Sequence, residues 1–292
     1  MKTINRTSLA ALLIANTYIL SACGGGGGGS SDSTANLTLG LTDAPFDEAQ
    51  SVTVAFDSIT LQGPERTVIE FDEPMIIDLL DFQNGERIIL LDEQELEPGE
   101  YQFIRLGVVE ALSSIEVNGE VFDLTIPSGE QSGLQLNRGF TLGVATTSDF
   151  TIDFDVRRSV VRQGNGEFRL RPTLRLVDSL AVENVSGVID ENFILDPACN
   201  NGDNNDIGNA VYLFEGSDIM PQDLQNNEFD PIASANVIFN VETSEFQYTI
   251  GFVPNGEYTV AFTCDAQLDD PSVDDLAAVN FPLVFNVVVP SN

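Results

Sequence analysis

The sequence predicts an all-β protein of two β-sandwich domains that follow an export segment and a glycine-rich linker. Three observations predict this class. Apolar and polar residues alternate over short runs separated by turn residues, as in half-buried strands. The pair Asn118-Gly119 joins two such runs, which is a strong signal for a β-hairpin. The phrase Gly-Glu-Tyr opens an apolar run at Gly99 and again at Gly256.

The N-terminal segment, residues 1–22, has the layout of an export signal. Lys2 and Arg6 precede an apolar run that is shorter than the roughly 20 residues needed to span a bilayer. The following phrase, Leu20-Ser21-Ala22-Cys23, resembles the lipobox of bacterial lipoproteins. This resemblance implies that Cys23 is lipidated and begins the mature chain. The alternative is an ordinary secretory signal with an incidental cysteine. Gly24 after the cysteine implies, by the same resemblance, an outer-membrane location in a Gram-negative host.

Residues 23–35 contain Gly24–Gly29 and small polar residues, and we expect them to be a flexible tether. The first domain is predicted over residues 36–178. A change of parity between Phe56 and Ile59 predicts a bulge near Asp57-Ser58, and Asp92–Glu97 is predicted to be a short helix. Its strands are indicated by apolar residues that share a face: Leu37, Leu39 and Leu41; Val52, Val54 and Phe56; Ile59 and Leu61; Phe140, Leu142 and Val144; Ile152, Phe154 and Val156; Phe168, Leu170, Leu174 and Leu176.

The second domain is predicted over residues 180–292. Each domain contains a Pro/Gly turn followed by Gly-Glu-Tyr, and a tyrosine in this position can bury its ring while its hydroxyl bonds to nearby backbone. The shared phrase resembles that of transthyretin-like (prealbumin-like) or carboxypeptidase-regulatory-like sandwiches. The predicted strands are Val185–Ile189, Ala210–Phe214, Ala235–Phe239, Phe246–Phe252, Tyr258–Cys264 and Phe281–Val289.

The composition excludes several classes of function. The chain has 46 acidic residues, 12 basic residues and no histidine. Such a charge repels nucleic acid phosphates, so we expect no nucleic acid partner. The lack of histidine excludes Ser-His-Asp and Cys-His catalysis and histidine-bound zinc. Two explanations for the acidity stay open: adaptation to high salt and specific binding of divalent metal.

Several phrases of the first domain occur in the order typical of one bacterial family. They are Leu41-Thr42-Asp43-Ala44-Pro45, Pro98–Leu106, Ile126–Leu134, Ile152–Ser159 and Leu170-Arg171-Pro172-Thr173-Leu174-Arg175. With them the domain resembles the domain of unknown function 4382 family, whose members are typically exported and often lipid-anchored. The resemblance implies a compartment and a fold, and it implies no activity.

Charged residues in two neighbouring strands form a candidate ligand-binding face. Thr151, Asp153, Asp155 and Arg157 share one face of a strand, and Arg169, Arg171 and Arg175 share a face of the next. A three-residue loop at Gly164–Gly166 would set Asp155 opposite Arg175. One interpretation is a structural ladder of ion pairs on a solvated sheet. The other is a polar face on which the arginines hold a carboxylate or sulfate in bidentate fashion.

The two cysteines of the second domain, Cys199 and Cys264, are predicted to form a disulfide, because exported cysteines more often pair than react. Pairing would bring two acidic loops together. These loops offer the oxygen ligands that calcium takes, although their spacing does not match an EF-hand. A solvated acidic rim is the alternative. The candidate calcium ligands are Asp196, Asp203, Asp206, Asp265, Asp269 and Asp270.

The sequence therefore predicts a non-enzymatic binding or scaffolding protein, held in the cell envelope by an N-terminal lipid. Its expected partners are the membrane and an envelope glycan or protein. The chain has no tryptophan, and its mature tyrosines lie in strand-like runs, so nothing in it positively indicates a sugar-binding platform. The alternative function is an envelope hydrolase that acts on glycans through carboxylates such as Asp153 and Asp155.

Overall fold

The computed structural model describes residues 34–44, 46, 49–127, 133–196, 199, 208–225, 227, 229–271, 273 and 279–291. The export segment, Cys23 and residues 24–33 of the expected linker lie outside these residues, whereas Ala35, the last residue of that expected linker, already begins β1 (Ala35–Ala44) and is buried. None of the helices that the structure describes has the length and apolar character to cross a membrane.

The first β-structure contains a sheet centred on β1, whose residues Leu37, Leu39 and Leu41 are fully buried. β1 pairs in parallel with β11 and antiparallel with β4. The order of strands in this sheet is β14 (Leu174–Asp178), β11 (Thr147–Asp155), β1 (Ala35–Ala44) and β4 (Ile88–Leu96).

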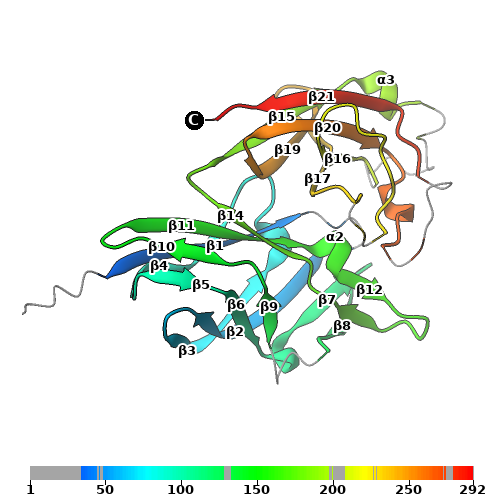
Figure 1. Ribbon diagram of the computed structural model, residues 1–292. Coiled ribbons are helices and arrows are strands. Elements are labelled where there is room, and N and C mark those ends of the chain that lie inside the picture. Colours follow the sequence, from blue (N-terminus) through cyan, green and yellow to red (C-terminus); the bar gives the residue numbers. More distant parts are fainter. Residues whose placement is uncertain are drawn as a thin grey trace, which may run out of the picture. The chain divides into compact units, whose positions relative to one another are not determined.

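A second, larger sheet faces the first (Figure 1). In this sheet β2 (Ser51–Gln62) forms a hairpin with β3 (Arg66–Asp78). The order of the other strands is β12 (Val160–Arg162), β13 (Phe168–Leu170), β8 (Glu120–Thr125), β7 (Ser114–Val117), β2 (Ser51–Gln62), β6 (Phe103–Val108) and β9 (Leu134–Leu136).

One hydrophobic core lies between these two sheets, because their inward-facing residues form a single buried cluster that includes Phe154 of β11 and Phe56 of β2. A two-stranded sheet, β5 (Gly99–Tyr101) with β10 (Phe140–Leu142), closes one side of this core. Short 3₁₀ turns at Leu79–Asp81 and Glu110–Leu112 and the single-turn helix α2 (Val156–Ser159) complete this part.

The second β-structure also consists of two sheets around a separate core. The strand β16 (Ala210–Glu215) is buried on both faces. One face packs in the core between the two sheets, and loops cover the other face. One sheet contains β15 (Val182–Ile189), β19 (Glu245–Pro254) and β18 (Ile238–Asn240). The other contains β17 (Ala233–Asn236), β16 (Ala210–Glu215), β20 (Gly256–Thr263) and β21 (Leu283–Val289). Two short helical segments, α3 (Glu191–Ile194) and a 3₁₀ turn at Ala266–Leu268, belong to this part.

The predicted all-β sandwich class is confirmed, together with several local details. The register of β2 shifts between Phe56 and Ser58, where the bulge is predicted. Asn118 and Gly119 both have positive φ, as a two-residue type I′ hairpin requires. Both Gly-Glu-Tyr phrases form the predicted corner. Tyr101 Oη donates to the carbonyl of Glu97 and Tyr258 Oη to that of Pro254, each over 2.8 Å.

The predicted helix at Asp92–Glu97 is wrong, because Asp92–Leu96 belong to β4 and Glu97 follows the end of that strand. Leu91 and Leu96 are buried, and pairing with β1 continues past Asp92 through a bulge at which Glu93 has positive φ. Burial and cross-strand pairing therefore outweigh the local helix propensity of the charged residues.

Two other strand expectations need correction, and the strand β3 is missed. Val144 lies outside β10 and is exposed. The expected single strand Ala235–Phe239 is divided at Val237 between β17 and β18, which belong to different sheets. The long strand β3 carries no strong apolar alternation and is not predicted by the sequence, because most of its residues are exposed or half-buried.

Candidate functional site

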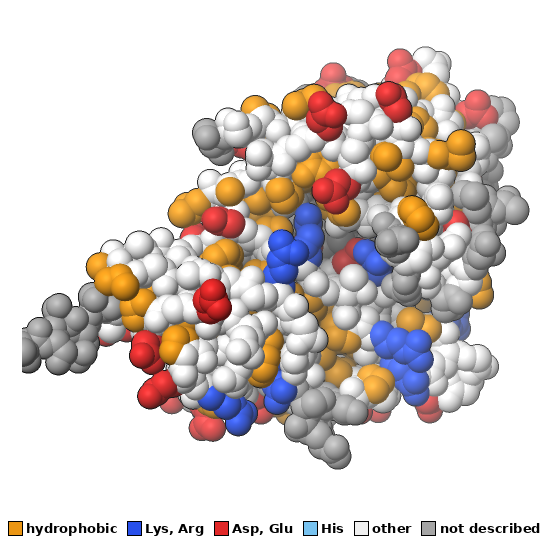
Figure 2. All heavy atoms as spheres, in the orientation of Figure 1, with side chains coloured by type: hydrophobic (Ala, Val, Ile, Leu, Met, Phe, Trp, Pro, Cys, Tyr) orange, Lys and Arg blue, Asp and Glu red, His pale blue; other side chains and the backbone are white. Residues whose placement is uncertain are grey.

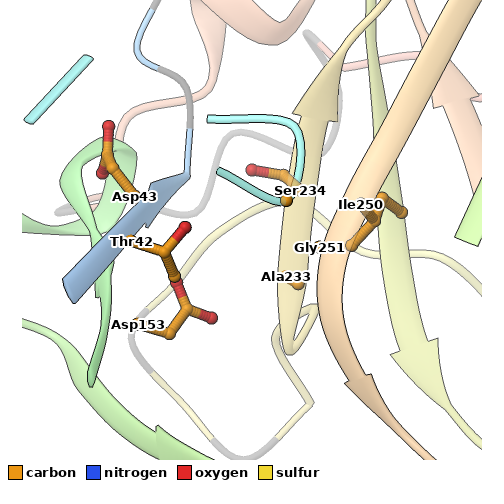
Figure 3. Close-up of a pocket in the computed structure, with 8 residues that line it drawn as sticks. Thr42, Asp43, Asp153, Ala233, Ser234, Ile250 and Gly251 are labelled. Atoms are coloured by element: carbon orange, nitrogen blue, oxygen red, sulfur yellow. The ribbon is translucent and has the colours of Figure 1, made fainter. Parts of the chain in front are cut away.

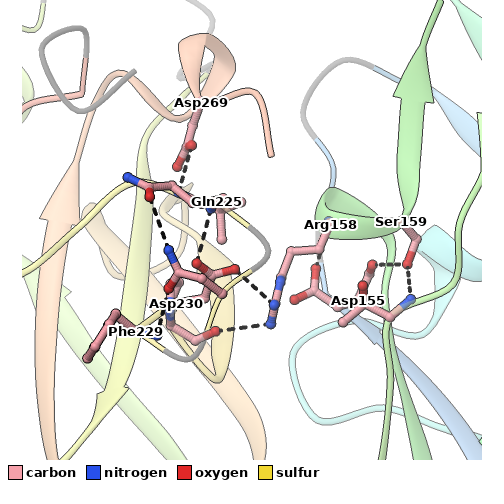
Figure 4. A network of polar contacts seen from close by, with 11 residues as sticks. Asp155, Arg158, Ser159, Gln225, Phe229, Asp230 and Asp269 are labelled. Carbon is pink, nitrogen blue, oxygen red and sulfur yellow. Dashed lines mark hydrogen bonds and ion pairs between the residues drawn. The ribbon is translucent and has the colours of Figure 1, made fainter. Parts of the chain in front are cut away.

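The end of β11 determines how the candidate site is built. Asp155 ends the strand and caps α2 by accepting a hydrogen bond from the backbone N–H of Arg158 over 3.0 Å. Ser159 Oγ donates to the Asp155 carbonyl and accepts from the Thr173 N–H. These contacts hold the single turn of helix that carries Arg157 and Arg158 (Figure 4). Because α2 follows directly after Asp155, β11 ends there and does not continue toward the expected hairpin. The expected pairing of Asp155 with Arg175 is therefore wrong.

Arg175 instead lies opposite Asp153 in the register of β11 and β14. Its Nε and Nη2 atoms contact Asp153 Oδ2 at 3.0 and 2.5 Å. This pair is the structural ladder that the sequence suggests, displaced by two residues. Asp153 is buried and also lines a small pocket of about 10 Å³ with Thr42, Ser234 and Gly251 (Figure 3). A pocket of this size has room for no more than about one water molecule, so it is no sugar site.

The two arginines of α2 both reach the second β-structure. Arg157 is 3 % exposed, and its guanidinium donates to the carbonyl of Ala266 and to Asn236 Oδ1. It also lies 6.0 Å from the centroid of the Tyr212 ring. Because these contacts bury it, Arg157 is a structural residue in this arrangement and does not face solvent.

Arg158 forms an ion pair with Asp230, with 2.9 Å between Nη2 and Oδ2. The Asp230 side chain is 2 % exposed and its Oδ1 accepts from the backbone N–H of Gln225 (Figure 4). The ion pair holds Arg158 at the edge of an open groove. The sequence does not predict this groove. The remaining residues that line this groove come from both β-structures.

The groove has a volume of about 750 Å³. We call it the arginine groove, because its described lining contains three arginines and no acidic side chain. The lining residues are Pro127, Arg158, Val161, Arg169, Leu170, Arg171, Pro172, Thr173, Gln225 and Pro271. In Figure 2 several basic side chains lie around α2 and β12 and others lie at the lower edge of the visible face, whereas acidic side chains are scattered over the visible surface.

The three arginines of the groove differ in their partners. Arg169 Nε and Nη2 lie 2.7 and 3.1 Å from the Gln163 side-chain oxygen when that amide is oriented to accept both. Arg171 is exposed, and within the described part of the chain its guanidinium has neither an ion pair nor a hydrogen bond. Its backbone N–H donates to the Ser159 carbonyl over 2.7 Å, which extends the pairing of β12 with β13. The groove therefore presents one free guanidinium beside two that are held.

The Asp155 carboxyl group, which caps α2, has a raised pKa. Burial raises the pKa of Asp155 to about 6, although the nearby positive charge of Arg158 and a backbone hydrogen bond act in the opposite direction. Neither Asp155 nor Asp153 lines the arginine groove. The two carboxylates of the candidate face thus cap a helix and pair with Arg175.

The predicted disulfide is present between Cys199 and Cys264. The six candidate calcium ligands are distributed differently. Asp203 and Asp206 lie outside the described residues. Asp269 is buried and accepts hydrogen bonds from Tyr212 Oη and the Leu224 N–H at 2.6 and 2.9 Å. Asp265 accepts from the Asn280 N–H, and Asp196 and Asp270 are exposed. Within the described ranges no three His, Cys, Asp or Glu side chains are grouped to hold a metal.

Sequence reasoning identifies Arg169 and Arg171 but misses Arg158 and Asp230. A signal for Arg158 exists, because six of the ten arginines after the export segment lie between Arg157 and Arg175. Asp230 has no comparable signal, since it is one of many acids in the second β-structure and its partner lies 72 residues earlier in the chain.

Residues 34–172 match the family described as Domain of unknown function (DUF4382). No curated protein and no solved structure matches the chain. The matched segment runs from β1 to the residues after β13, and it includes all three arginines of the groove. The segment that builds most of the first sandwich and the basic wall of the arginine groove is therefore the part of the chain that is similar to the DUF4382 family.

Proposed function

We propose that this protein is an exported, lipid-anchored protein of the cell envelope that binds a ligand without transforming it, and that the arginine groove is the binding site. One observation carries the proposal. In a chain with 46 acidic and 12 basic residues, three arginines and no acid make up the charged lining of one open groove among the described residues. Arginines at a concave site suit recognition of anionic groups.

The anchor in this proposal is the lipid on Cys23, which follows the export segment of residues 1–22. The linker at residues 23–35 would let the folded part stand away from the membrane, because glycine-rich chains are flexible. Gly24 favours the outer membrane as the location in a Gram-negative host. An envelope glycan or an envelope protein would be the partner in the groove.

The test is sedimentation of the detergent-solubilised mature protein with envelope fragments from a host strain that lacks it. We expect wild-type protein to sediment with the fragments, and the bound fraction to fall strongly in Arg171→Gln. Arg66→Gln is the matched control, since Arg66 is exposed and lies at the start of β3, outside the groove. Equal sedimentation of Arg171→Gln and wild type would refute the groove as the binding site.

The second candidate function is a hydrolase that acts on envelope glycans. The raised pKa of Asp155, about 6, favours it, because general acids in glycosidases have raised pKa values. The pairing of Asp153 with Arg175 speaks against it, since the second carboxylate is then engaged. Incubation of the protein with envelope glycans distinguishes the two functions. Reproducible release of sugars that is abolished by Asp153→Ala or Asp155→Ala would establish the hydrolase and overturn the binding function.

A further inference from the structure

The arginine groove also carries information about the class of its ligand. Phe168 and Leu170 point into the core, so Arg169 and Arg171, on either side of Leu170, lie on the opposite, outer face. Residues two apart in an extended strand are separated by about 6.6 Å. The backbone hydrogen bond from Arg171 to Ser159 keeps this segment extended. The side chains of Arg169 and Arg171 thus leave the backbone on the same face, and both line the groove.

The guanidinium groups of Arg169 and Arg171 differ in how many of their N–H donors are available to a ligand. Gln163 orients Arg169 but occupies only two of its nitrogen atoms. Arg171 has all of its N–H donors available to a ligand, as far as the described residues show. Arg158 contributes little net charge, because Asp230 neutralises it at 2.9 Å. The net charge that the lining offers to a ligand is therefore close to two.

The other lining residues exclude some ligand classes. Pro127, Val161 and Pro271 provide small apolar surfaces, and the described lining contains no aromatic ring on which a sugar or a base could stack. Thr173 contributes a hydroxyl group to the same wall. Recognition in the groove must then rest on charge and hydrogen bonds to anionic groups.

The charge of the whole chain limits the length of the ligand. Its formal net charge is −34. A long polyanion would extend beyond the groove onto this acidic surface and be repelled, whereas a compact anion would end inside it. The volume of about 750 Å³ is far larger than a single inorganic ion needs and is in the range of small-molecule sites.

We propose that the part of the envelope ligand that enters the arginine groove is a compact dianionic group with two carboxylates, one on Arg171 and one on Arg169. This inference rests on the proposed function, and it names the ligand class of the same site. Each carboxylate would accept paired N–H donors from one guanidinium, and the intervening carbon chain would lie over the apolar residues of the groove.

The test is isothermal titration calorimetry of the detergent-solubilised mature protein at constant ionic strength. The probes are the linear dicarboxylates from malonate to suberate, together with acetate, inorganic phosphate and sulfate. We expect the tightest binding in the middle of the dicarboxylate series, where the spacing of the carboxylates matches that of the guanidinium groups. Acetate should bind at least about tenfold more weakly, since it engages one arginine only.

The variants separate specific recognition from general charge. Arg171→Gln should weaken the best dicarboxylate roughly 10- to 100-fold, the loss of a charge-assisted bidentate contact. Arg171→Lys should recover only part of the affinity, because an ammonium group has no planar fork. Arg66→Gln should leave binding unchanged.

Two results would overturn the ligand class. One is the absence of heat from every dicarboxylate at millimolar concentration, and the other is tighter binding of phosphate or sulfate than of any dicarboxylate. If Arg171→Gln also fails to reduce binding to envelope fragments, the proposed function falls as well. If that binding is lost in Arg171→Gln while dicarboxylates stay silent, only the ligand class is refuted.

Discussion

Arg157 and Arg158 are adjacent arginines that have different contacts and therefore different roles. Arg157 is buried against Tyr212, Asn236 and the backbone of Ala266. Arg158 is partly exposed, pairs with a buried aspartate and lines the groove. Arg157 and Arg158 are consecutive residues of the single-turn helix α2, so their side chains point in different directions.

The ion pair of Arg158 with Asp230 yields a prediction about stability. Arg158→Met leaves the buried Asp230 carboxylate without its cation, so we expect the free energy of unfolding to fall by roughly 3–5 kcal/mol. The double variant Arg158→Met with Asp230→Leu should recover most of this loss, because no buried charge remains. Urea unfolding of the three proteins measures it. A double variant as unstable as the single one would contradict the prediction.

The raised pKa of Asp155 yields a prediction about pH. The native state holds this proton more tightly than the unfolded chain, whose aspartate pKa is about 3.9. The stabilisation is therefore complete below pH 4 and is lost as pH rises through about 6. Asp155→Asn removes the titration and keeps a side chain that can cap α2. We expect it to match wild type near pH 4 and to be more stable at pH 7, by up to about 3 kcal/mol.

Asp149 provides the control of opposite sign. The hydrogen bond from Arg87 lowers the pKa of Asp149, so its ionised form stabilises the native state above the unfolded pKa and the stabilisation is lost as pH falls. Asp149→Asn should thus be less stable than wild type at pH 7 and approach it at low pH. Thermal unfolding between pH 4 and pH 7 compares both variants. Parallel curves for Asp155→Asn and wild type would disprove the raised pKa.

At the scale of elements, the tyrosine corners are the clearest repeated feature of the two sandwiches. In each, a buried tyrosine near the start of a strand bonds to the carbonyl four residues earlier. The bond closes the turn that precedes the strand and leaves the ring in the core. The repetition explains why the same short phrase occurs in two otherwise different segments of the chain.

This feature can be tested with single-atom changes. Tyr101→Phe and Tyr258→Phe each remove one hydroxyl group and leave a carbonyl without its partner, so each should lower the free energy of unfolding by about 1 kcal/mol or somewhat more. Tyr248→Phe is the matched control, because Tyr248 is also buried but its hydroxyl has no hydrogen bond among the described residues. Equal effects of all three substitutions would argue against a structural role for the corner.

The acidic loops beside the Cys199–Cys264 disulfide have two interpretations, a calcium-binding site and a solvated acidic rim. Asp269 is already engaged by Tyr212 and Leu224, which leaves Asp196, Asp203, Asp206, Asp265 and Asp270 as candidate ligands. If calcium binds there, titration in moderate salt should release or absorb heat and the melting temperature should rise. Asp265→Asn with Asp270→Asn should abolish both effects. No heat and no change in melting temperature would leave the acids with solvation alone.

At the scale of the whole molecule, the two sandwiches contact each other closely. The residues from Ser33 onward form one compact unit. A Cβ atom on Gly251 of β19 would lie 2.6 Å from the Cα atom of Gly85, which precedes β4. No side chain fits between these two backbones, so glycine is required at this approach.

The anchor is the remaining prediction at this scale. Cys23→Ser removes the site of lipidation, and because a lipid rather than a spanning helix would hold the protein, we expect the variant in soluble fractions. Cell fractionation with a salt wash measures the distribution, and Cys199→Ser with Cys264→Ser controls for loss of a cysteine elsewhere. Retention of Cys23→Ser in washed membranes would contradict a lipid anchor.

The sequence by itself determined the all-β class, most strand positions, the bulge at Asp57-Ser58, the hairpin at Asn118-Gly119, the tyrosine corners and the disulfide. These features depend on local patterns, such as the alternation of side chains and the turn preferences of glycine, or, for the disulfide, on there being one candidate pair. Only the tertiary structure decided that Asp92–Leu96 forms part of a strand, that Arg175 pairs with Asp153, and that Arg158, Arg169 and Arg171 share a groove. These depend on which distant segments meet, and burial and pairing across that distance outweigh local propensity.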